Sequence, residues 1–303
     1  MLDELVESSF RGQFAGHETF PLRLLWLKKA HDAVRANPRT FHEQDAIARF
    51  GVGRNMVLAI RHWALAAGIL RDSPAGLAPT PIGDLLFAED TGLDPYLEDP
   101  STAWWVHFRF AGSPEQTTTF FYAFNGLSQP VFDRAALVRG LAEWGEGKRS
   151  WRLSPSTLKR DVEVFVRSYV STGNGEDAAE PLLAELNVVR ESGIPGRFEF
   201  SRGPKPTLAD GIFAVALRSF WRRWHRDSPT LTLEQACYAP GSPGRVFKLD
   251  EESVHERLSR IDGTTAGALA WTDTAGLRQV IFREEIDDLA LLRSAYRSSR
   301  GKP

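Results

Sequence analysis

The sequence predicts a mainly α-helical protein with small β-hairpins, and three observations support this fold class. Apolar residues recur at helical spacing along most of the chain. Pro, Ser, Thr or Asp precedes several of these segments, as is typical where helices begin. Two turn-rich stretches, 72–75 and 273–276, lie between short apolar segments, which predicts hairpins. We expect an N-terminal unit over residues 1–90, a helical middle region over 91–200, and a helical unit with a hairpin over 201–303.

The composition limits the classes of function. The 303 residues carry a net charge of -2, so no broad basic field exists and any DNA contact must come from local patches. Cys237 is the only cysteine, which excludes an internal disulfide and a Cys-rich metal site. The acidic start Met1-Leu2-Asp3-Glu4 is unlike a signal peptide, and no apolar run approaches the ~20 residues that cross a bilayer. We therefore expect a cytoplasmic protein without membrane association.

The first 90 residues show the element order of a winged helix-turn-helix. We expect helices over 21–36, 43–50 and 54–67, a hairpin over 69–79, and a last helix that Thr80 opens. The turn before the third helix contains glycine where a tight or left-handed backbone is needed. The side chains expected to face the core of these three helices are Leu22, Leu25, Trp26, Lys29, Ala33, Ile47, Phe50, Val57, Ile60 and Ala64.

The third helix would present its polar face to DNA. Arg and Asn side chains are the ones that reach guanine and adenine edges in a major groove. The residues expected to contact DNA lie on this helix, on the first helix and on the hairpin: Arg54, Asn55, Arg61, His62, Lys28, Lys29 and Arg71. Residues 1–72 carry ten Lys and Arg against eight Asp and Glu, which permits DNA binding without requiring it. A winged helix used only for protein contacts is the alternative.

The middle region is rich in aromatic residues between 101 and 125. We favour two buried helices here over a surface that stacks on bases. The acidic run 84–99 is interpreted as a linker, further helices are expected over 133–145 and 154–171, and residues 198–200 alternate like a strand.

Two basic stretches follow, Lys148 to Arg152 with Lys159-Arg160, and Arg218 to Arg226. Each is either a solvated helix face or a track for a DNA backbone.

The C-terminal third repeats the winged-helix order. Helices are expected over 207–224, 233–237 and 251–261, followed by a hairpin over 268–282. Asp250 is a helix cap. The helix after it mixes Glu and Arg, which is unfavourable for phosphate and favours contact with protein.

Several motifs together carry a family resemblance. They are Phe14-Ala15-Gly16-His17-Glu18-Thr19-Phe20-Pro21-Leu22-Arg23, Trp26-Leu27-Lys28-Lys29, Phe50-Gly51-Val52-Gly53-Arg54-Asn55-Met56-Val57, Ile60-Arg61-His62-Trp63, Gly241-Ser242-Pro243-Gly244-Arg245-Val246-Phe247-Lys248-Leu249 and Ala275-Gly276-Leu277. The chain resembles the SspB family of bacterial DNA phosphorothioation systems over nearly its whole length.

The resemblance implies a role in replacing a non-bridging phosphate oxygen of DNA by sulfur, within antiphage defence. It implies DNA, a cysteine desulfurase, an ATP-pyrophosphatase-type enzyme and an ATPase as partners, with the SspB-type component nicking the DNA. The single cysteine agrees with this division of labour, and the chain also lacks a GxxxxGK[ST] phosphate loop. A homodimer is compatible with the sequence, which does not fix the oligomeric state.

A nick requires an activated water and stabilisation of negative charge, usually by divalent cations on carboxylates. The chain has no clear nuclease signature, and we expect His17 and Glu18 to be catalytic, with Glu18 as the ligand of Mg²⁺ or Mn²⁺. In the alternative interpretation, Glu18 caps the first helix and His17 locks the N-terminal arm onto the core. Asp161 and Glu163 are a second carboxylate candidate, weakened because residues two apart on a helix point apart.

Three functions follow from the sequence: a metal-dependent nicking endonuclease, a non-catalytic DNA-binding adaptor, and a winged-helix transcriptional regulator.

Overall fold

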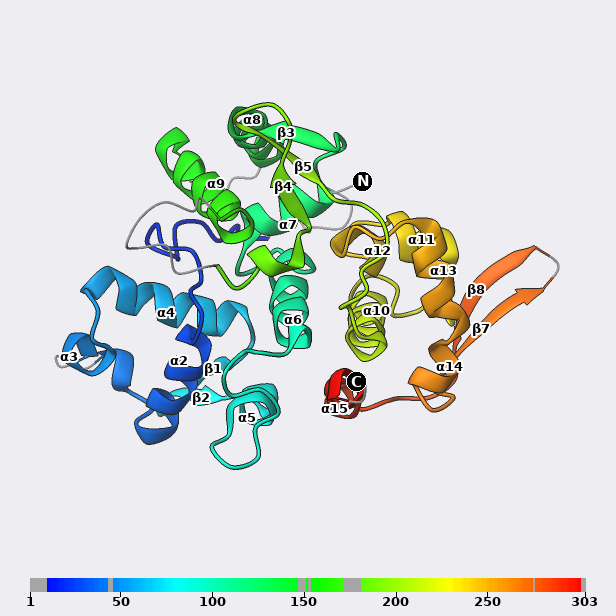
Figure 1. The fold of residues 1–303 in the computed structure, drawn as a ribbon, viewed down its shortest axis with the longest axis horizontal. Helices are drawn as coiled ribbons and strands as arrows, with labels where there is room; N and C mark the ends of the chain where they lie inside the picture. The colour runs from blue at the N-terminus through cyan, green and yellow to red at the C-terminus, as the bar shows by residue number, and fades with distance from the viewer. Residues whose placement is uncertain are drawn as a thin grey trace.

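The structure, a computed structural model, describes residues 10–42, 46–146, 151, 154–171, 181–274 and 276–300, with the backbone alone over 297–300. The fold is mainly helical with small antiparallel sheets, as the sequence predicts. Figure 1 shows the N-terminal and middle elements gathered on one side and the C-terminal elements on the other, with α6 and α10 between them. Among the described residues, no helix has both the length and the apolar composition needed to cross a membrane.

The N-terminal elements follow the expected order. They are α2 (Trp26–Ala36), η1 (Thr40–His42), α3 (Ala46–Phe50), α4 (Arg54–Ala66), β1 (Leu70–Ser73), β2 (Gly76–Pro79) and α5 (Pro81–Phe87). The strands pair antiparallel, with Leu70 opposite Pro79. Thr80 caps α5 by accepting a hydrogen bond from the Gly83 N–H at 3.0 Å.

The first helix begins later than predicted. Leu25 adopts a left-handed backbone with φ 64°, which cannot continue a right-handed helix, so α2 begins at Trp26 and not at Pro21. The expected core stripe is therefore shifted: Leu25 is 44% exposed, whereas Leu27 and Ala30 are fully buried. Ile47 was also expected inside and is 49% exposed.

The middle elements combine helices with a sheet that the sequence analysis largely missed. They are α6 (Pro100–Ala111), α7 (Thr118–Asn125), β3 (Val131–Asp133), α8 (Arg134–Gly145), α9 (Pro155–Tyr169), η2 (Ala184–Leu186), β4 (Val189–Glu191) and β5 (Arg197–Phe200). The sheet order is β3-β5-β4, antiparallel throughout. Helix α9 begins as expected, because the Ser154 hydroxyl accepts the Thr157 N–H at 3.1 Å.

The aromatic residues of α6 and α7 form the centre of the core, which confirms the interpretation as two buried helices. Phe110, Phe120 and Phe124 are each at most 2% exposed, so they offer no stacking surface for bases. The acidic run 84–99, interpreted from the sequence as a linker, continues past the end of α5 and contains an ordered turn. The buried Asp94 carboxylate accepts the Glu98 N–H at 2.8 Å.

The C-terminal elements complete the chain. They are α10 (Asp210–Trp224), β6 (Thr230–Thr232), α11 (Leu233–Tyr238), α12 (Pro243–Val246), α13 (Glu251–Ser259), α14 (Ile261–Thr264), β7 (Leu269–Thr274), β8 (Leu277–Phe282) and α15 (Asp288–Arg300). Strand β6, which the sequence analysis missed, pairs with β8 to give the sheet order β6-β8-β7. Asp250 caps α13 as predicted, accepting the Ser253 N–H at 2.8 Å.

Buried polar contacts tie the C-terminal elements to the middle ones. The Asn125 side chain accepts the Gly241 N–H at 2.7 Å, and Lys248 donates to the Phe124 carbonyl at 2.8 Å. His107 in α6 lies 2.9 Å from the Val246 carbonyl. Such contacts cross the expected boundary at residue 200. The division of the chain into units at residues 90 and 200 stays a prediction.

Candidate functional site

The α3–turn–α4 segment presents the first turn of α4 to solvent. Gly51 in the turn has φ 64°, the left-handed conformation expected of it. Val57 and Ile60 of α4 are buried in the core, as predicted. Arg54 and Asn55 are exposed at the start of the helix. This end of α4 therefore offers one guanidinium and one amide on a rigid element.

The remaining basic residues of this face are partly engaged within the chain. An Arg61 guanidinium nitrogen lies 3.7 Å from an Asp72 carboxylate oxygen on β1. Lys28 forms an ion pair with Asp32 one turn further along α2. Lys29 donates to the Phe50 carbonyl at 2.5 Å, which closes the end of α3.

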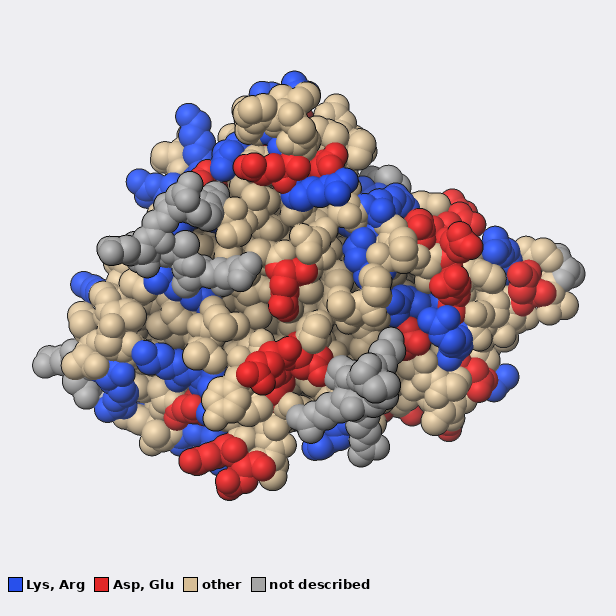
Figure 2. Space-filling model, viewed as in Figure 1, with Lys and Arg blue, Asp and Glu red and all other residues tan. Residues whose placement is uncertain are grey.

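Arg71 is exposed on β1 beside this surface. Figure 2 shows Lys and Arg interspersed with Asp and Glu on the face it displays, so no single basic field dominates there.

His62 does not face outward with Arg54, and that expectation is wrong. It is 8% exposed, with its ring 6.1 Å from the ring of His17. Burial, together with the nearby His17 and Arg61, lowers the pKa of His62 to about 3, so its imidazole is neutral near pH 7. Helical periodicity distinguishes the apolar face of α4 from its polar face, but it cannot show that another segment of the chain buries part of the polar face.

The covering segment is residues 14–21, which we call the strap. Its tight course uses left-handed backbone at Ala15, Glu18 and Thr19, with φ between 48° and 72°. The Phe20 N–H donates to the His17 carbonyl at 2.8 Å, which closes a turn within the strap. The backbone at Gly16 lies so close to His62 that only glycine fits there, since a Cβ at this position would lie 2.4 Å from Nδ1 of His62.

The strap joins α4 to the middle helices. The Trp63 indole N–H in α4 donates to the Phe20 carbonyl at 3.0 Å. The Ala15 N–H donates to the Asp161 carboxylate in α9 at 2.8 Å. The ring of His17 stacks on Trp63, with centroids 5.8 Å apart.

His17 and Asp161 form a buried pair. Nε2 of His17 lies 3.2 Å from Oδ1 of Asp161, although the two are not aligned as a hydrogen bond. Nδ1 of His17 accepts the Thr19 N–H at 3.2 Å, which assigns the ring proton to Nε2. The Thr119 hydroxyl donates to the other Asp161 oxygen at 3.2 Å.

The surroundings of this pair leave little free space. His17 and Asp161 are 4% and 3% exposed. The cavity between them and His62 measures about 10 Å³, the size of one water at most. This geometry favours the interpretation of His17 as a lock, and the catalytic roles of His17 and Glu18 stay predictions.

Asp161 and Glu163 point apart, as their spacing predicts. Asp161 is buried against the strap, whereas Glu163 is partly exposed and forms an ion pair with Arg134 at 2.7 Å. The contact between Asp161 and His17 was not predicted from the sequence. The two residues are 144 positions apart, and no local pattern joins them.

The second basic stretch is largely neutralised. Arg218 is 3% exposed and is paired with Glu285 and Asp288. Arg223 forms an ion pair with Glu115. In the first stretch, Lys159 and Arg160 are exposed on α9, and 147–150 and 152–153 lie outside the described residues.

The one cysteine is also buried. Burial raises the pKa of the Cys237 thiol to about 12, so the thiolate that sulfur transfer requires is scarce near neutral pH.

Comparisons with known proteins match almost the whole chain. The model of the family described as "Protein of unknown function (DUF4007)" matches residues 14–296. A crystal structure of magnesium ion-bound SspB shows 26% sequence identity and a TM-score of 0.83, covering 99% of this chain and 91% of the other. A second SspB crystal structure shows 26% identity and a TM-score of 0.82, covering 96% and 90%. The comparison with curated proteins gives no match. The resemblance to SspB is thereby confirmed.

The magnesium in that relative raises the question of a metal site in this chain. Within the described residues, no group of three or more His, Cys, Asp or Glu side chains is arranged to hold a metal ion. Both oxygens of Asp161 already accept hydrogen bonds. Magnesium needs octahedral oxygen ligands, so the residues around the strap do not by themselves fit it.

Proposed function

The chain belongs to the DUF4007 family, and we propose that it is the DNA-binding component of an SspB-type phosphorothioation system that nicks DNA in support of sulfur insertion. The similarity to SspB over 99% of the chain supports the pathway. The observation that carries DNA binding is the exposure of Arg54 and Asn55 at the start of α4, directly after the Gly51–Gly53 turn.

We interpret α2, α3, α4 and the β1–β2 hairpin as a winged helix. Helix α4 then enters the major groove with its N-terminal end first, and Arg71 on the hairpin contacts phosphate. Lys28 and Lys29 contribute less, because both ammonium groups already have partners within the chain. Release of Arg61 from Asp72 would add a phosphate contact.

The C-terminal elements support a second winged helix. Helix α10, strand β6, helices α11 and α13, and the β7–β8 hairpin follow each other in that order along the chain. Helix α13 carries Glu251, Glu252 and Glu256, which repel phosphate. We propose that this unit contacts the protein partners: the cysteine desulfurase, the ATP-pyrophosphatase-type enzyme and the ATPase.

For the nicking step we propose different roles for the two strap residues. His17 is buried against Asp161 and acts as a positioning residue. Glu18 is partly exposed on the strap, so its carboxylate is the one available to a reacting phosphate. A Mg²⁺ or Mn²⁺ ion would depend on the phosphates of bound DNA for further ligands, as Mg²⁺ commonly does at phosphate-processing sites.

The DNA-binding proposal is tested with the double variant Arg54→Ala/Asn55→Ala. We expect its affinity for duplex DNA, measured by gel shift, to fall at least about tenfold, because one bidentate base contact is worth ~1–3 kcal/mol. Arg139→Ala removes an exposed arginine on α8 and is the matched control. Unchanged affinity in the double variant would remove α4 from the interface.

Nicking is tested with supercoiled plasmid and either Mg²⁺ or Mn²⁺. We expect open-circular product from the wild type, and much less from Glu18→Gln at unchanged duplex affinity. If the Glu18→Gln variant nicks the plasmid as fast as the wild type does, the proposed role of Glu18 is wrong.

A non-catalytic adaptor is the second candidate function. The absence of a metal-binding cluster among the described residues favours it. DNA that shifts on a gel but is never nicked with either cation would establish the adaptor and rule out the nicking enzyme.

A further inference from the structure

A large cavity lies at the end of α10, far along the chain from the strap. Its volume is about 810 Å³, within the range of ligand-binding clefts. One wall carries three arginines at four-residue spacing, Arg218 and Arg222 in α10 and Arg226 in the turn after it. Phe282 of β8 and Glu285 from the segment that leads to α15 line the other side.

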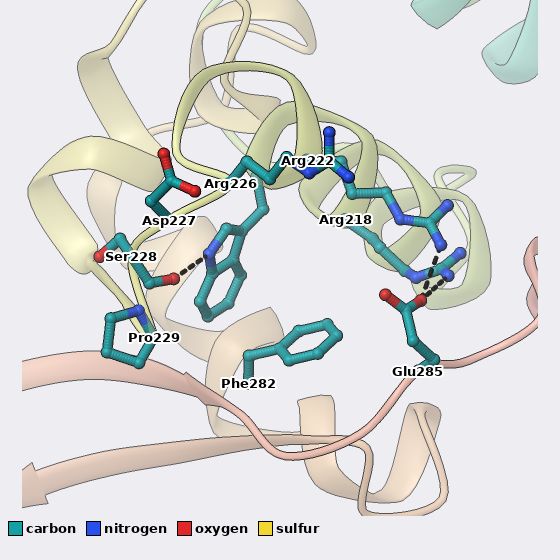
Figure 3. A pocket seen from close by; sticks show the side chains of 9 residues that line it. Arg218, Arg222, Arg226, Asp227, Ser228, Pro229, Phe282 and Glu285 are labelled. Carbon is teal, nitrogen blue, oxygen red and sulfur yellow. Dashed lines mark hydrogen bonds and ion pairs between the residues drawn. The ribbon is translucent and has the colours of Figure 1, made fainter.

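Two of these arginines converge on one carboxylate. Arg218 and Arg222 donate to the same Glu285 oxygen at 2.5 and 2.7 Å, as Figure 3 shows. Asp288 is also paired with Arg218 and lies 3.6 Å from Arg222. Arg218 is 3% exposed, and its buried Nε has no hydrogen-bond partner. The cavity therefore contains a guanidinium pair that two carboxylates hold in place.

The carboxylate that joins the two arginines lies at the protein surface. The Glu285 side chain is 65% exposed and belongs to an irregular segment between β8 and α15. The Arg218 guanidinium is buried and requires an anionic partner, whereas Glu285 reaches it from solvent, so another anion that arrives from solvent can take the same donors. Two guanidinium groups on one acceptor are also the arrangement that binds phosphate.

The third arginine is not neutralised in this way. Arg226 is exposed, and no ion pair joins it to a side chain in the described part of the protein, although its neighbour Asp227 also lines the cavity. Arg218 and Arg222 are four residues apart in α10, which corresponds to about 6 Å of rise, and Arg226 continues the row in the turn after the helix. Such a row can contact consecutive phosphates of one strand.

The apolar part of the cavity is an aromatic ring with rigid support. Phe282 is partly exposed, and its ring packs edge-on against Trp221 with centroids 5.7 Å apart. Trp221 is 4% exposed and is fixed by donation to the Ser228 carbonyl at 2.8 Å. A partly exposed ring beside a row of arginines is a combination that binds an unstacked base next to its phosphates.

We propose that this cavity binds a single strand of DNA, with a phosphate replacing the Glu285 carboxylate between Arg218 and Arg222. A neighbouring phosphate contacts Arg226, and a base stacks on Phe282. A duplex is disfavoured, because its bases are stacked inside and reach such a ring only by flipping out. The inference rests on the proposed function, since a nick is what frees a strand beside the protein.

The proposal is tested by fluorescence anisotropy with a labelled oligothymidylate about twelve nucleotides long, a length in the range of single-strand sites. Glu285→Gln removes the competing charge and is expected to tighten binding about threefold or more, as the loss of a like charge near one phosphate implies. Arg226→Ala and Phe282→Leu are expected to weaken binding at least about fivefold each, the lower end for one lost stacking or charge contact. Arg139→Ala is the control, and thermal melting verifies folding of every variant.

Several outcomes would overturn the proposal. The wild type could fail to bind the oligothymidylate. Alternatively, the Glu285→Gln and Arg226→Ala variants could bind it with the same affinity as the wild type. An oligoglutamate peptide that competes better than the strand would assign the cavity to a protein partner instead. Thymidine monophosphate that binds as tightly as the strand would assign it to a free nucleotide. Duplex affinity, measured alongside with the Arg54→Ala/Asn55→Ala variant, reports separately on the function proposed above.

Discussion

Acidification is expected to destabilise the protein through His62, and the size of the effect follows from its burial. The pKa of His62 is lowered from 6.5 to about 3, chiefly by loss of solvation and then by His17 and Arg61. Between these pH values the unfolded chain binds a proton that the folded chain does not. The contribution of His62 is therefore fully present above pH 6.5 and is lost as the pH falls from 6.5 towards 3.

The magnitude at pH ~5 is about 2 kcal/mol, from a gap of ~1.5 pH units at ~1.4 kcal/mol per unit. His107 adds a similar amount, because burial lowers its pKa to about 3 as well. Its ring is enclosed between the Tyr169 hydroxyl at 2.8 Å and the Val246 carbonyl at 2.9 Å. The two histidines together are expected to reduce the free energy of unfolding by about 4 kcal/mol between pH ~7.5 and ~5.

Urea unfolding at these two pH values, followed by circular dichroism, measures the loss. His62→Gln keeps a polar side chain of similar length but removes the titrating group. We expect its loss between the two pH values to be about 2 kcal/mol smaller than that of the wild type. The control His42→Gln, at an exposed position, is expected to behave like the wild type. If His62→Gln loses as much stability as the wild type, the burial of a neutral His62 under the strap is refuted.

Two further predictions concern the strap. Asp161→Ala leaves the Ala15 N–H without its acceptor and is expected to cost about 3 kcal/mol of unfolding free energy in urea. Glu163→Ala, at a partly exposed position, is expected to cost under about 1 kcal/mol, and equal costs would contradict the anchoring role of Asp161. Gly16→Ala places a methyl group 2.4 Å from His62 Nδ1 and is expected to lower stability by about 1–3 kcal/mol in the same assay; a melting temperature equal to that of the wild type would show that the strap does not pack on α4 as described.

Much of the fold could be predicted because its signals are local. Caps at Thr80, Ser154 and Asp250 mark helix starts, and each accepts the expected backbone N–H. The three-residue strands β3, β4 and β6 were missed, because three residues are too few to establish an alternating pattern. The late start of α2 depends on Leu25 in a left-handed conformation, which leaves no trace in apolar spacing.

The site was predictable only in part, for a related reason. Sequence patterns indicated that residues 14–21 are distinctive and that Arg54 and Asn55 face outward, and the outward position is confirmed. The burial of His62 could not be predicted from sequence patterns. The apolar spacing of α4 shows only the face that packs on the neighbouring helices, whereas His62 is buried because the strap covers another face of α4. The contact of His17 with Asp161 depends on how the arm meets α9, a tertiary arrangement without a local signal.

The position of the strap along α4 has a consequence for the proposed nicking. Arg54 and His62 are eight residues apart, which corresponds to about 12 Å along the helix. A group that acts on a phosphate must come within about 3 Å of it. The strap packs on His62 through Gly16 and His17, so the proposed base contact at Arg54 and the proposed phosphate contact at Glu18 would involve different nucleotides of the same DNA. Loss of Arg54 should weaken binding and nicking together, whereas loss of Glu18 should slow nicking at unchanged affinity. Because α4 connects the two places rigidly, the register between the recognised bases and the nick is expected to be fixed.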